Sequence, residues 1–194
     1  MKSPQSSQPK TAALPFVQME ICILAGGLSS RMGRNKSQLR LGRKTLLTHI
    51  RQSAGTLQLP IRIIRRDLIP RCGPLGGIYT ALKTSSAEAV LFLACDMPLV
   101  RESLLTQLLE KFQTAHPAVF TSRSSAVGFP FVLSAKTVSL VEQLLSEKTF
   151  SLQNLAHKLR AKRFCPGRKF ESDLLNANTT QEWAVLRKEF AKKN

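Results

Sequence analysis

The sequence predicts an α/β fold built around a mostly parallel central sheet. Short apolar runs alternate along the chain with segments whose apolar residues recur at the helical period, which is the pattern of βαβ units. The run at residues 90–95 is almost continuously apolar, as expected for a central strand that is covered on both faces. With 194 residues, 43% of them hydrophobic, the chain can bury one sizeable core, so we expect a single domain over residues 19–194.

Each expected element is assigned from its own apolar pattern. The expected strands are at residues 21–24, 61–65, 90–95, 117–121 and 127–133. The helical stripe is clearest within residues 102–112, where Leu104, Leu105 and Leu108 share one face. Further helices are expected at residues 44–53, 78–82, 136–145 and 179–190. Residues 73–77, Gly-Pro-Leu-Gly-Gly, are expected to form a glycine-rich turn in front of the helix at 78–82.

The first 18 residues differ from the rest of the chain. They are polar and rich in Pro, Ser and Gln, so we expect residues 1–18 to form a disordered tail. They lack the apolar stretch of a signal peptide, and no later run approaches the length of a membrane span. We therefore expect a cytoplasmic protein with no membrane partner.

The chain is strongly basic, with 29 Lys and Arg residues against 12 acidic ones and a net charge of +17. This charge implies an anionic partner or substrate, although a basic surface also serves solubility. No nucleic-acid-binding motif accompanies the charge, and the few aromatic residues are not interleaved with the basic ones. We therefore do not expect nucleic acid as a partner.

The cysteines give no sign of a metal site. All four lie far apart without a C-x-x-C pair, and the three histidines do not cluster near them. Cys22 and Cys95 lie in apolar strand runs, so we expect them to be small core residues. A zinc site is not expected.

A glycine-rich loop follows the first expected strand. Gly26 and Gly27 allow backbone N–H groups to approach a ligand closely, and the cations Arg31 and Lys36 follow within the same loop. Such a loop suits the phosphates of a nucleotide, although a glycine-rich turn with solvated cations is the alternative. It is not a P-loop, because Asn35 rather than glycine precedes Lys36, and the dinucleotide fingerprint G-x-G-x-x-G is absent.

Asp96 is the second strong functional signal, since it directly follows the most apolar strand. In open α/β sheets the ligand crevice lies at the carboxyl ends of the strands, so Asp96 is expected to face the same crevice as the Gly26-Gly27 loop. A carboxylate that faces a nucleoside triphosphate usually binds a bridging Mg²⁺. The alternative is an N-cap of the next helix, which the intervening residues 98–100 disfavour.

Two weaker signals complete the set. Asp67 precedes the glycine-rich segment at 73–77, where Gly73 and Gly76 allow close approach of the backbone to a nucleobase, and its carboxylate is suited to accept hydrogen bonds from a base or sugar. Asn176 and Asn178 offer amide groups just before the last expected helix, where Asn178 or Thr179 is also suited to cap that helix.

Four motifs stand in an order that is typical of one family. Residues 24–36 contain Leu-Ala-Gly-Gly, then Ser, Arg-Met-Gly and Lys; residues 73–77 contain Gly-Pro-Leu-Gly-Gly; residues 95–98 contain Cys-Asp-Met-Pro; residues 176–179 contain Asn-Ala-Asn-Thr. Asp67 precedes the second motif and Asp173 the last. From Glu20 on, the chain resembles the molybdenum cofactor guanylyltransferases, within the nucleotidyltransferases of the sugar-nucleotide pyrophosphorylase type.

The resemblance implies a Rossmann-like three-layer sandwich that forms a single nucleotidyltransferase domain. It also implies transfer of GMP from GTP to the terminal phosphate of molybdenum-molybdopterin, with release of pyrophosphate. Arg31, Lys36 and Asp96 would be the catalytic residues, with Mg²⁺ on Asp96. The nucleotide would be bound by Leu24, Ala25, Gly26, Gly27, Lys36, Asp67, Gly73, Gly76 and Asp96, with Asn176 and Asn178 as support. Molybdoenzymes or cofactor chaperones would be further protein partners.

The sequence departs from the family pattern at three places. Asn35 stands where the family usually has Asp, and Gly128-Phe129-Pro130 replaces the usual His-Pro. The segment before Gly73 is shorter than usual, and an asparagine that the family uses there for the nucleotide has no match. A cytidylyltransferase, another NTP transferase, and a non-catalytic relative that binds nucleotides or nucleic acid therefore remain alternatives.

Overall fold

A six-stranded sheet in the order β4-β1-β5-β7-β6-β8 forms the centre of the computed structural model, which describes residues 18–26, 39–113 and 117–192. The strands are β1 Met19–Leu24, β4 Ile61–Ile64, β5 Ala89–Ala94, β6 Ala118–Arg123, β7 Ala126–Ser134 and β8 Lys162–Phe164. Every neighbouring pair is parallel except the two that involve β7. The mostly parallel sheet predicted from the sequence is thereby confirmed.

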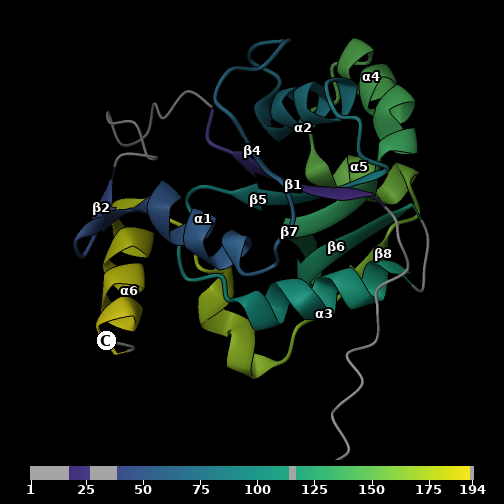
Figure 1. Cartoon of the computed structure of the whole chain (residues 1–194). Coiled ribbons are helices and arrows are strands. Elements are labelled where there is room, and N and C mark those ends of the chain that lie inside the picture. The colour runs from purple at the N-terminus through teal and green to yellow at the C-terminus, as the bar shows by residue number, and fades with distance from the viewer. Residues whose placement is uncertain (1–17, 27–38, 114–116, 193–194) are drawn as a thin grey trace, which may run out of the picture.

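Helices cover both faces of this sheet (Figure 1). On one face lie α2 (Gly73–Lys83), α4 (Val138–Ser146) and α5 (Leu152–Lys158), and on the other lie α1 (Leu46–Gly55) and α3 (Glu102–Gln113). Each interface holds its own apolar cluster, because the side chains of a strand alternate between the two faces. Cys22 thus packs on the α2 side while Ile21 and Ile23 pack on the α3 side. The expected three-layer sandwich is confirmed.

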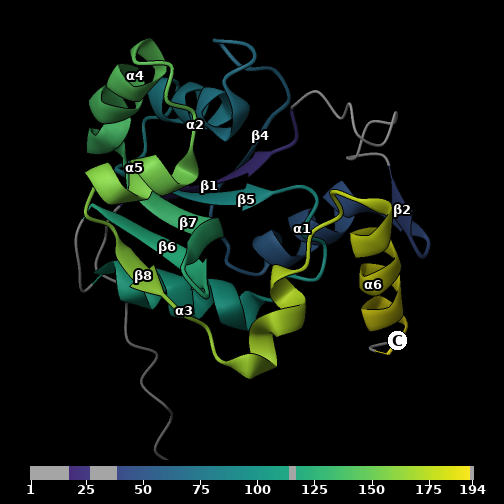
Figure 2. The ribbon, with the colours of Figure 1, turned by 180° about the vertical axis from the view of Figure 1, so that it is seen from behind.

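A third apolar cluster joins the last helix to one end of the sheet. The short strands β2 (Arg40–Leu41) and β3 (Lys44–Thr45) form a hairpin beside α6 (Thr180–Ala191), as Figure 2 shows. Leu41 of the hairpin, Leu186 of α6 and Leu99 are buried together in this cluster. A 3₁₀ helix, η3 (Arg168–Leu174), leads the chain from β8 toward α6.

The main difference from the predicted elements concerns residues 73–77. They form the first turn of α2 rather than a turn in front of it, so this prediction was wrong. Pro74 lies within the first two helical positions, where its missing N–H needs no partner and its fixed φ suits a helix. Gly73 begins the helix at a φ of +55°, a conformation that glycine adopts readily.

Four short elements have no counterpart in the prediction: the β2–β3 hairpin, α5, β8 and η3. A shorter 3₁₀ helix, η2 (Ala135–Thr137), also begins the segment that was expected to be one helix at residues 136–145. The expected tail at residues 1–18 lies outside the described residues except for Gln18, whose carbonyl oxygen accepts a hydrogen bond from the Glu88 N–H at 2.8 Å. In the described part of the chain, no helix is long and apolar enough to cross a membrane.

Candidate active site

Asp96 lies where the carboxyl ends of two central strands meet. It follows β5 by two residues, and the N–H of neighbouring Cys95 donates to the carbonyl of Leu24, the last residue of β1, at 3.1 Å. The side chain is half-buried. Helix α3 begins only at Glu102, so Asp96 does not cap it, and the alternative reading of Asp96 as an N-cap is excluded.

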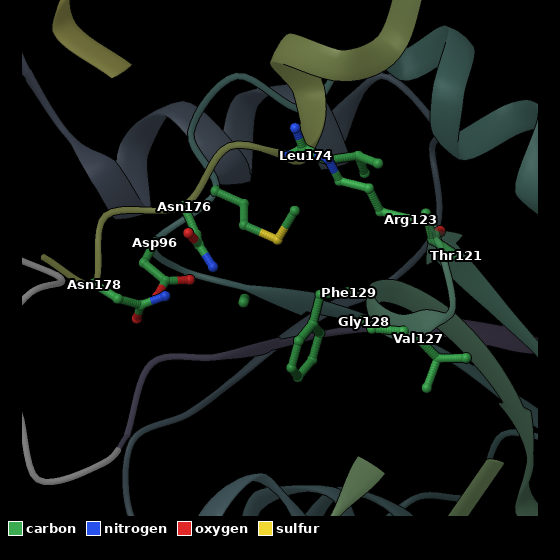
Figure 3. Close-up of a pocket in the computed structure, with 12 residues that line it drawn as sticks. Asp96, Thr121, Arg123, Val127, Gly128, Phe129, Leu174, Asn176 and Asn178 are labelled. Carbon is green, nitrogen blue, oxygen red and sulfur yellow. The ribbon is translucent and has the colours of Figure 1, made fainter. Parts of the chain in front are cut away.

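The two asparagines predicted from the last motif lie beside Asp96. The N–H of Ala177, between Asn176 and Asn178, donates to the Asp96 carbonyl at 3.0 Å and joins the segment before α6 to the end of β5. All three polar side chains line one pocket with a volume of about 360 Å³ (Figure 3). The structure therefore brings together residues that are eighty positions apart in the sequence.

The cap of α6 is made by residues other than these asparagine side chains. The Thr179 hydroxyl accepts from the Glu182 N–H at 3.1 Å, and the Glu182 carboxylate accepts from the backbone N–H groups of Asn178 and Thr179 at 2.9 Å each. This is a complete capping box, in which Thr179 is the N-cap. The Asn178 amide group is thus not needed as a cap and lines the pocket.

The opposite wall of the pocket comes from β6 and β7. Thr121 and Arg123 at the end of β6 face the pocket together with Val127, Gly128 and Phe129 of β7 (Figure 3). None of these was predicted as a site residue. Asp96 was predicted as a site residue because it is a polar residue at the carboxyl end of an expected strand. The same holds for Thr121, which is the last residue of the expected strand at 117–121.

The pocket opens because the sheet divides at this point. The β5–β7 ladder ends at the pair Phe92–Phe131, although β5 continues to Ala94. In the β6–β7 ladder, Phe120 pairs with Phe131 but Thr121 pairs with Gly128, so two residues of β7 bulge out of register. Bulges bend strands and redirect side chains, and they are frequent beside active sites. Here the bulge separates the start of β7 from β5 and leaves the pocket between them.

On the other side of β5, the end of β1 begins the predicted nucleotide loop. The Ala25 N–H donates to the Ile64 carbonyl at 2.8 Å, which holds the loop start against β4. A Cβ atom on Gly26 would lie 2.9 Å from the Arg65 carbonyl oxygen, so only glycine fits this close approach. Gly27, Arg31 and Lys36 lie outside the described residues.

Asp67 packs against the start of α2 and close to the end of β1. A Cβ atom on Gly76 would lie 2.9 Å from Asp67 Oδ2, and one on Gly77 would lie 3.4 Å from Asp67 Oδ1 and 3.2 Å from Leu24 Cδ2. The Leu68 N–H donates to the hydroxyl of Thr80 at 2.8 Å, which anchors this loop on α2. Partial burial raises the pKa of the Asp67 carboxyl above its usual value. Asp67, Gly76 and Leu24, three of the residues predicted to bind the nucleotide, therefore lie close together.

Gly73 differs from Gly76 and Gly77, because a Cβ atom there would approach neither Asp67 nor Leu24 within 4 Å. A Cβ atom on Gly73 would lie 3.7 Å from the Phe150 carbonyl oxygen. Its positive φ at the start of α2 gives this glycine a conformational role.

Comparison with known proteins places these features in a family. The pattern of the MobA-like NTP transferase domain matches residues 21–162. The chain belongs to this family. It is therefore a nucleotidyltransferase, and its glycine-rich loop, Asp96 and Asp67 lie within the matched region.

Two similar relatives extend the comparison. A protein of Flavobacterium johnsoniae named "Probable molybdenum cofactor guanylyltransferase" is 32% identical over 151 residues, which cover 71% of this chain and 80% of the relative. A protein of the same name from Carboxydothermus hydrogenoformans is 29% identical over 193 residues, covering 90% and 98% of the two chains. The second comparison extends beyond residue 162, where the family match ends.

The fold of this nucleotidyltransferase is also that of solved structures. Molybdopterin-guanine dinucleotide biosynthesis protein A from Archaeoglobus fulgidus superposes with a TM-score of 0.72 at 18% identity, over 89% of this chain and 99% of that one. A 4-diphosphocytidyl-2C-methyl-D-erythritol synthase from Anaerococcus prevotii gives a TM-score of 0.70 at 12% identity, over 89% and 98%. At these identities the likeness concerns the fold alone.

Proposed function

We propose that this nucleotidyltransferase transfers GMP from GTP to the terminal phosphate of molybdenum-molybdopterin and releases pyrophosphate. The observation that carries the proposal is the place of Asp96. It lies between the end of β1, where the nucleotide loop begins, and the pocket beside β7. The two relatives named as guanylyltransferases support this choice of nucleotide and acceptor.

The reaction needs alignment and charge neutralisation more than proton transfer. An oxygen of the acceptor phosphate forms a bond to the α-phosphorus of GTP, and the bond from this phosphorus to the pyrophosphate oxygen breaks. Two anions have to approach each other, and negative charge accumulates on the leaving group. Arg31 would hold the phosphates with its planar guanidinium and Lys36 with its ammonium.

The residues around Asp96 fit a magnesium ion. Mg²⁺ prefers oxygen ligands and is commonly held by one or two carboxylates together with substrate phosphates. Asp96 supplies one carboxylate, and Asn176 and Asn178 supply amide oxygens at the same pocket. Within the described ranges there is no group of three or more His, Cys, Asp or Glu residues able to form a cage by themselves. When bound, the ion would neutralise charge on the nucleotide phosphates.

Asp67 is suited to the base of GTP. The Watson–Crick edge of guanine presents two adjacent donors, N1–H and the 2-amino group, and a carboxylate accepts both at once. Cytosine presents only its amino group as a donor on that edge. Asp67 lies beside Gly76 and Leu24, which we infer to flank the base.

Thermal unfolding with GTP, CTP, ATP and UTP, each with and without Mg²⁺, tests the proposal. A nucleotide at one hundred times its Kd adds about 2.7 kcal/mol of apparent stability, so binding gives a clear rise in Tm. We expect a Mg²⁺-dependent rise in Tm with GTP and none with the other three nucleotides. In a separate assay with molybdenum-molybdopterin, we expect transfer of GMP. A rise with CTP alone would favour the cytidylyltransferase alternative, and no rise with any of the four would contradict nucleotidyl transfer.

The matched variants are Asp96→Asn and Glu110→Gln. Both remove one carboxylate, but Glu110 is exposed on α3. Asp96→Asn is expected to lose the Mg²⁺-dependent part of the GTP shift, whereas Glu110→Gln retains it. An unchanged shift in Asp96→Asn would remove Asp96 from the proposed metal site.

A further inference from the structure

We propose that Thr121 and Arg123 recognise the nucleotidyl acceptor. In this proposal the Thr121 hydroxyl hydrogen-bonds to a polar atom of the acceptor's heterocycle, and the Arg123 guanidinium pairs with an anionic group of the same molecule. The inference rests on the proposed function, since it assumes that Asp96 marks the position of the reacting phosphates. We call Thr121, Arg123 and Phe129 the acceptor wall.

The order of the strands separates the two substrates. Strand β5, which leads to Asp96, has β1 on one side and β7 on the other. The start of the nucleotide loop (Ala25 and Gly26) and Asp67 belong to the β1–β4 side, whereas the acceptor wall belongs to the β7–β6 side. The attacking and leaving oxygens lie roughly in line at the phosphorus in such transfers, so the acceptor has to approach from the side opposite the pyrophosphate. The pocket lies on the side of β5 away from the end of β1, where the nucleotide loop begins, and so offers the acceptor such an approach.

Thr121 differs from the other buried threonines of the protein. In the described part of the chain these are Thr80, Thr121 and Thr137, each at most 6% exposed. The Thr80 hydroxyl donates to the Gly76 carbonyl and the Thr137 hydroxyl to the Ser134 carbonyl, both at 2.7 Å. The Thr121 hydroxyl has no hydrogen-bond partner among the described residues, although the residue is only 2% exposed. Since buried hydroxyls are normally paired, this one has the character of a ligand contact.

The pocket is polar at both ends and apolar between them. Asp96, Asn176 and Asn178 lie at one end and Thr121 at the other, and the Arg123 side chain extends from beside Thr121 toward Leu174 (Figure 3). The side chains of Met97 and Phe129 contribute apolar surface to the lining. This arrangement suits an elongated molecule with a flat heterocyclic body.

Arg123 supplies a positive charge to the acceptor wall. It is exposed at the end of β6, lines the pocket, and forms no ion pair with the described residues. Arg163 of the neighbouring strand differs, because its guanidinium donates to the Ser125 carbonyl at 2.9 Å and so supports the β6–β7 turn. Arg123 has no such hydrogen bond within the described part of the chain, which leaves its charge available to an anionic acceptor.

The test is steady-state kinetics of Thr121→Val and Arg123→Gln with GTP and molybdenum-molybdopterin as substrates. Thr121→Val removes the hydroxyl at nearly constant volume, and we expect the KM for the acceptor to rise about fivefold, as for one neutral hydrogen bond. Arg123→Gln removes a charge-assisted contact and is expected to raise that KM by about tenfold or more. The KM for GTP should stay within about twofold of the wild-type value in both, since neither residue faces the nucleotide side.

Two control variants separate recognition from stability and from total charge. Thr137→Val deletes a buried hydroxyl that has a protein partner, so it should lower the Tm, whereas Thr121→Val should leave the Tm of the ligand-free protein unchanged or raise it. Lys158→Gln removes one positive charge at the exposed end of α5 and should leave both KM values unchanged.

Three outcomes would overturn the proposal. The first is an unchanged KM for the acceptor in both variants of an otherwise active enzyme, and the second is an equal rise of both KM values. The third is a drop in Tm for Thr121→Val as large as that for Thr137→Val, which would make its hydroxyl structural. Failure of the wild-type protein to transfer GMP to molybdenum-molybdopterin would instead contradict the proposed function, and the acceptor wall with it.

Discussion

Asp173 and Arg101 form an ion pair that joins the segment after Asp96 to the segment before Asn176. The Asp173 carboxylate is fully buried and lies 2.8 Å from Arg101 Nη2, and it also accepts from the Arg101 backbone N–H at 3.0 Å. Arg101 immediately precedes α3, on the segment that begins at Asp96, whereas Asp173 belongs to η3, just before Asn176. With the bond from Ala177 to Asp96, the pair fixes the asparagines beside the carboxylate.

The Asp173–Arg101 pair predicts unequal effects of deleting either partner. Arg101→Met leaves the fully buried Asp173 carboxylate without the Arg101 guanidinium; breaking a fully buried pair costs about 3–5 kcal/mol, and we expect a smaller loss of stability here because Arg101 is partly exposed. Asp173→Ala leaves the Arg101 guanidinium unpaired, but this side chain is 45% exposed and can be hydrated. The loss in free energy of unfolding should therefore be smaller than for Arg101→Met. Urea unfolding measures both. Equal losses would mean that the pair acts mainly through the packing of its side chains.

Asp96→Asn is expected to reduce kcat by a factor of about 100 or more while the protein stays folded, because the variant would no longer hold the Mg²⁺ that neutralises the phosphate charge. Pyrophosphate release measures turnover, and circular dichroism with a thermal melt measures folding. Glu110→Gln is the control for loss of a carboxylate, since Glu110 is exposed on α3. Unfolded Asp96→Asn protein would give Asp96 a structural role instead.

The raised pKa of Asp67 predicts a pH-dependent effect on stability. The folded protein binds the Asp67 proton more tightly than the unfolded chain does, so stability falls as the pH rises from the unfolded value of 3.8 through the higher folded value. Asp67→Asn lacks this penalty. The stability of the variant relative to the wild type should therefore increase over this window and level off above it, as measured by urea unfolding between about pH 4 and pH 7. A difference that does not change with pH would contradict the prediction.

Alanine substitutions at two helical glycines should have opposite effects. Gly76→Ala places a Cβ atom 2.8 Å from the Ile69 carbonyl oxygen and 2.9 Å from Asp67, so the loop before α2 has to shift and stability falls. Gly55→Ala meets nothing within 4 Å at the end of α1 and should add about 0.5–1 kcal/mol through higher helix propensity. Thermal melts compare the two. A neutral Gly76→Ala would show that this loop moves at little cost.

Thiol labelling should distinguish one cysteine from the other three. Cys165 is exposed, whereas Cys22, Cys72 and Cys95 are buried. Burial raises the pKa of Cys22 to about 12, so its reactive thiolate is scarce at neutral pH. An excess of thiol reagent should modify Cys165 rapidly in the native protein and all four cysteines after denaturation. Cys165→Ser should abolish the rapid phase; its persistence would indicate local opening of the core.

The position of Asp96 was predictable because it depends on strand polarity alone. Once β5 is recognised as a parallel central strand, the residues after it have to lie at the ligand-binding edge. Asn176 and Asn178 were found through their motif, but their place beside Asp96 depends on the backbone bond of Ala177, which no local pattern indicates.

Of the acceptor wall, only Thr121 carried a local signal, as the last residue of an expected strand; Arg123 and Phe129 carried none. The exposure of this wall to the pocket depends on where the β5–β7 ladder ends and on the bulge opposite Thr121, and both are contacts between distant segments. The start of α2 was missed for a related reason: glycines that suggest a turn are required there because Asp67 and Leu24 approach the helix closely. Short elements such as α5 and β8 contain too few residues for a period to be recognised.

The division of the sheet beyond Phe92 and Phe131 has a consequence for how this enzyme type can diversify. Past that pair, the start of β7 is hydrogen-bonded to β6 and not to β5, so the hairpin can change length or sequence without disturbing the strands that lead to Asp96 and the nucleotide loop. Exchange of residues 121–129 between relatives would thus be a route to new acceptors on a constant nucleotide-binding half, in engineered enzymes as well as in natural ones.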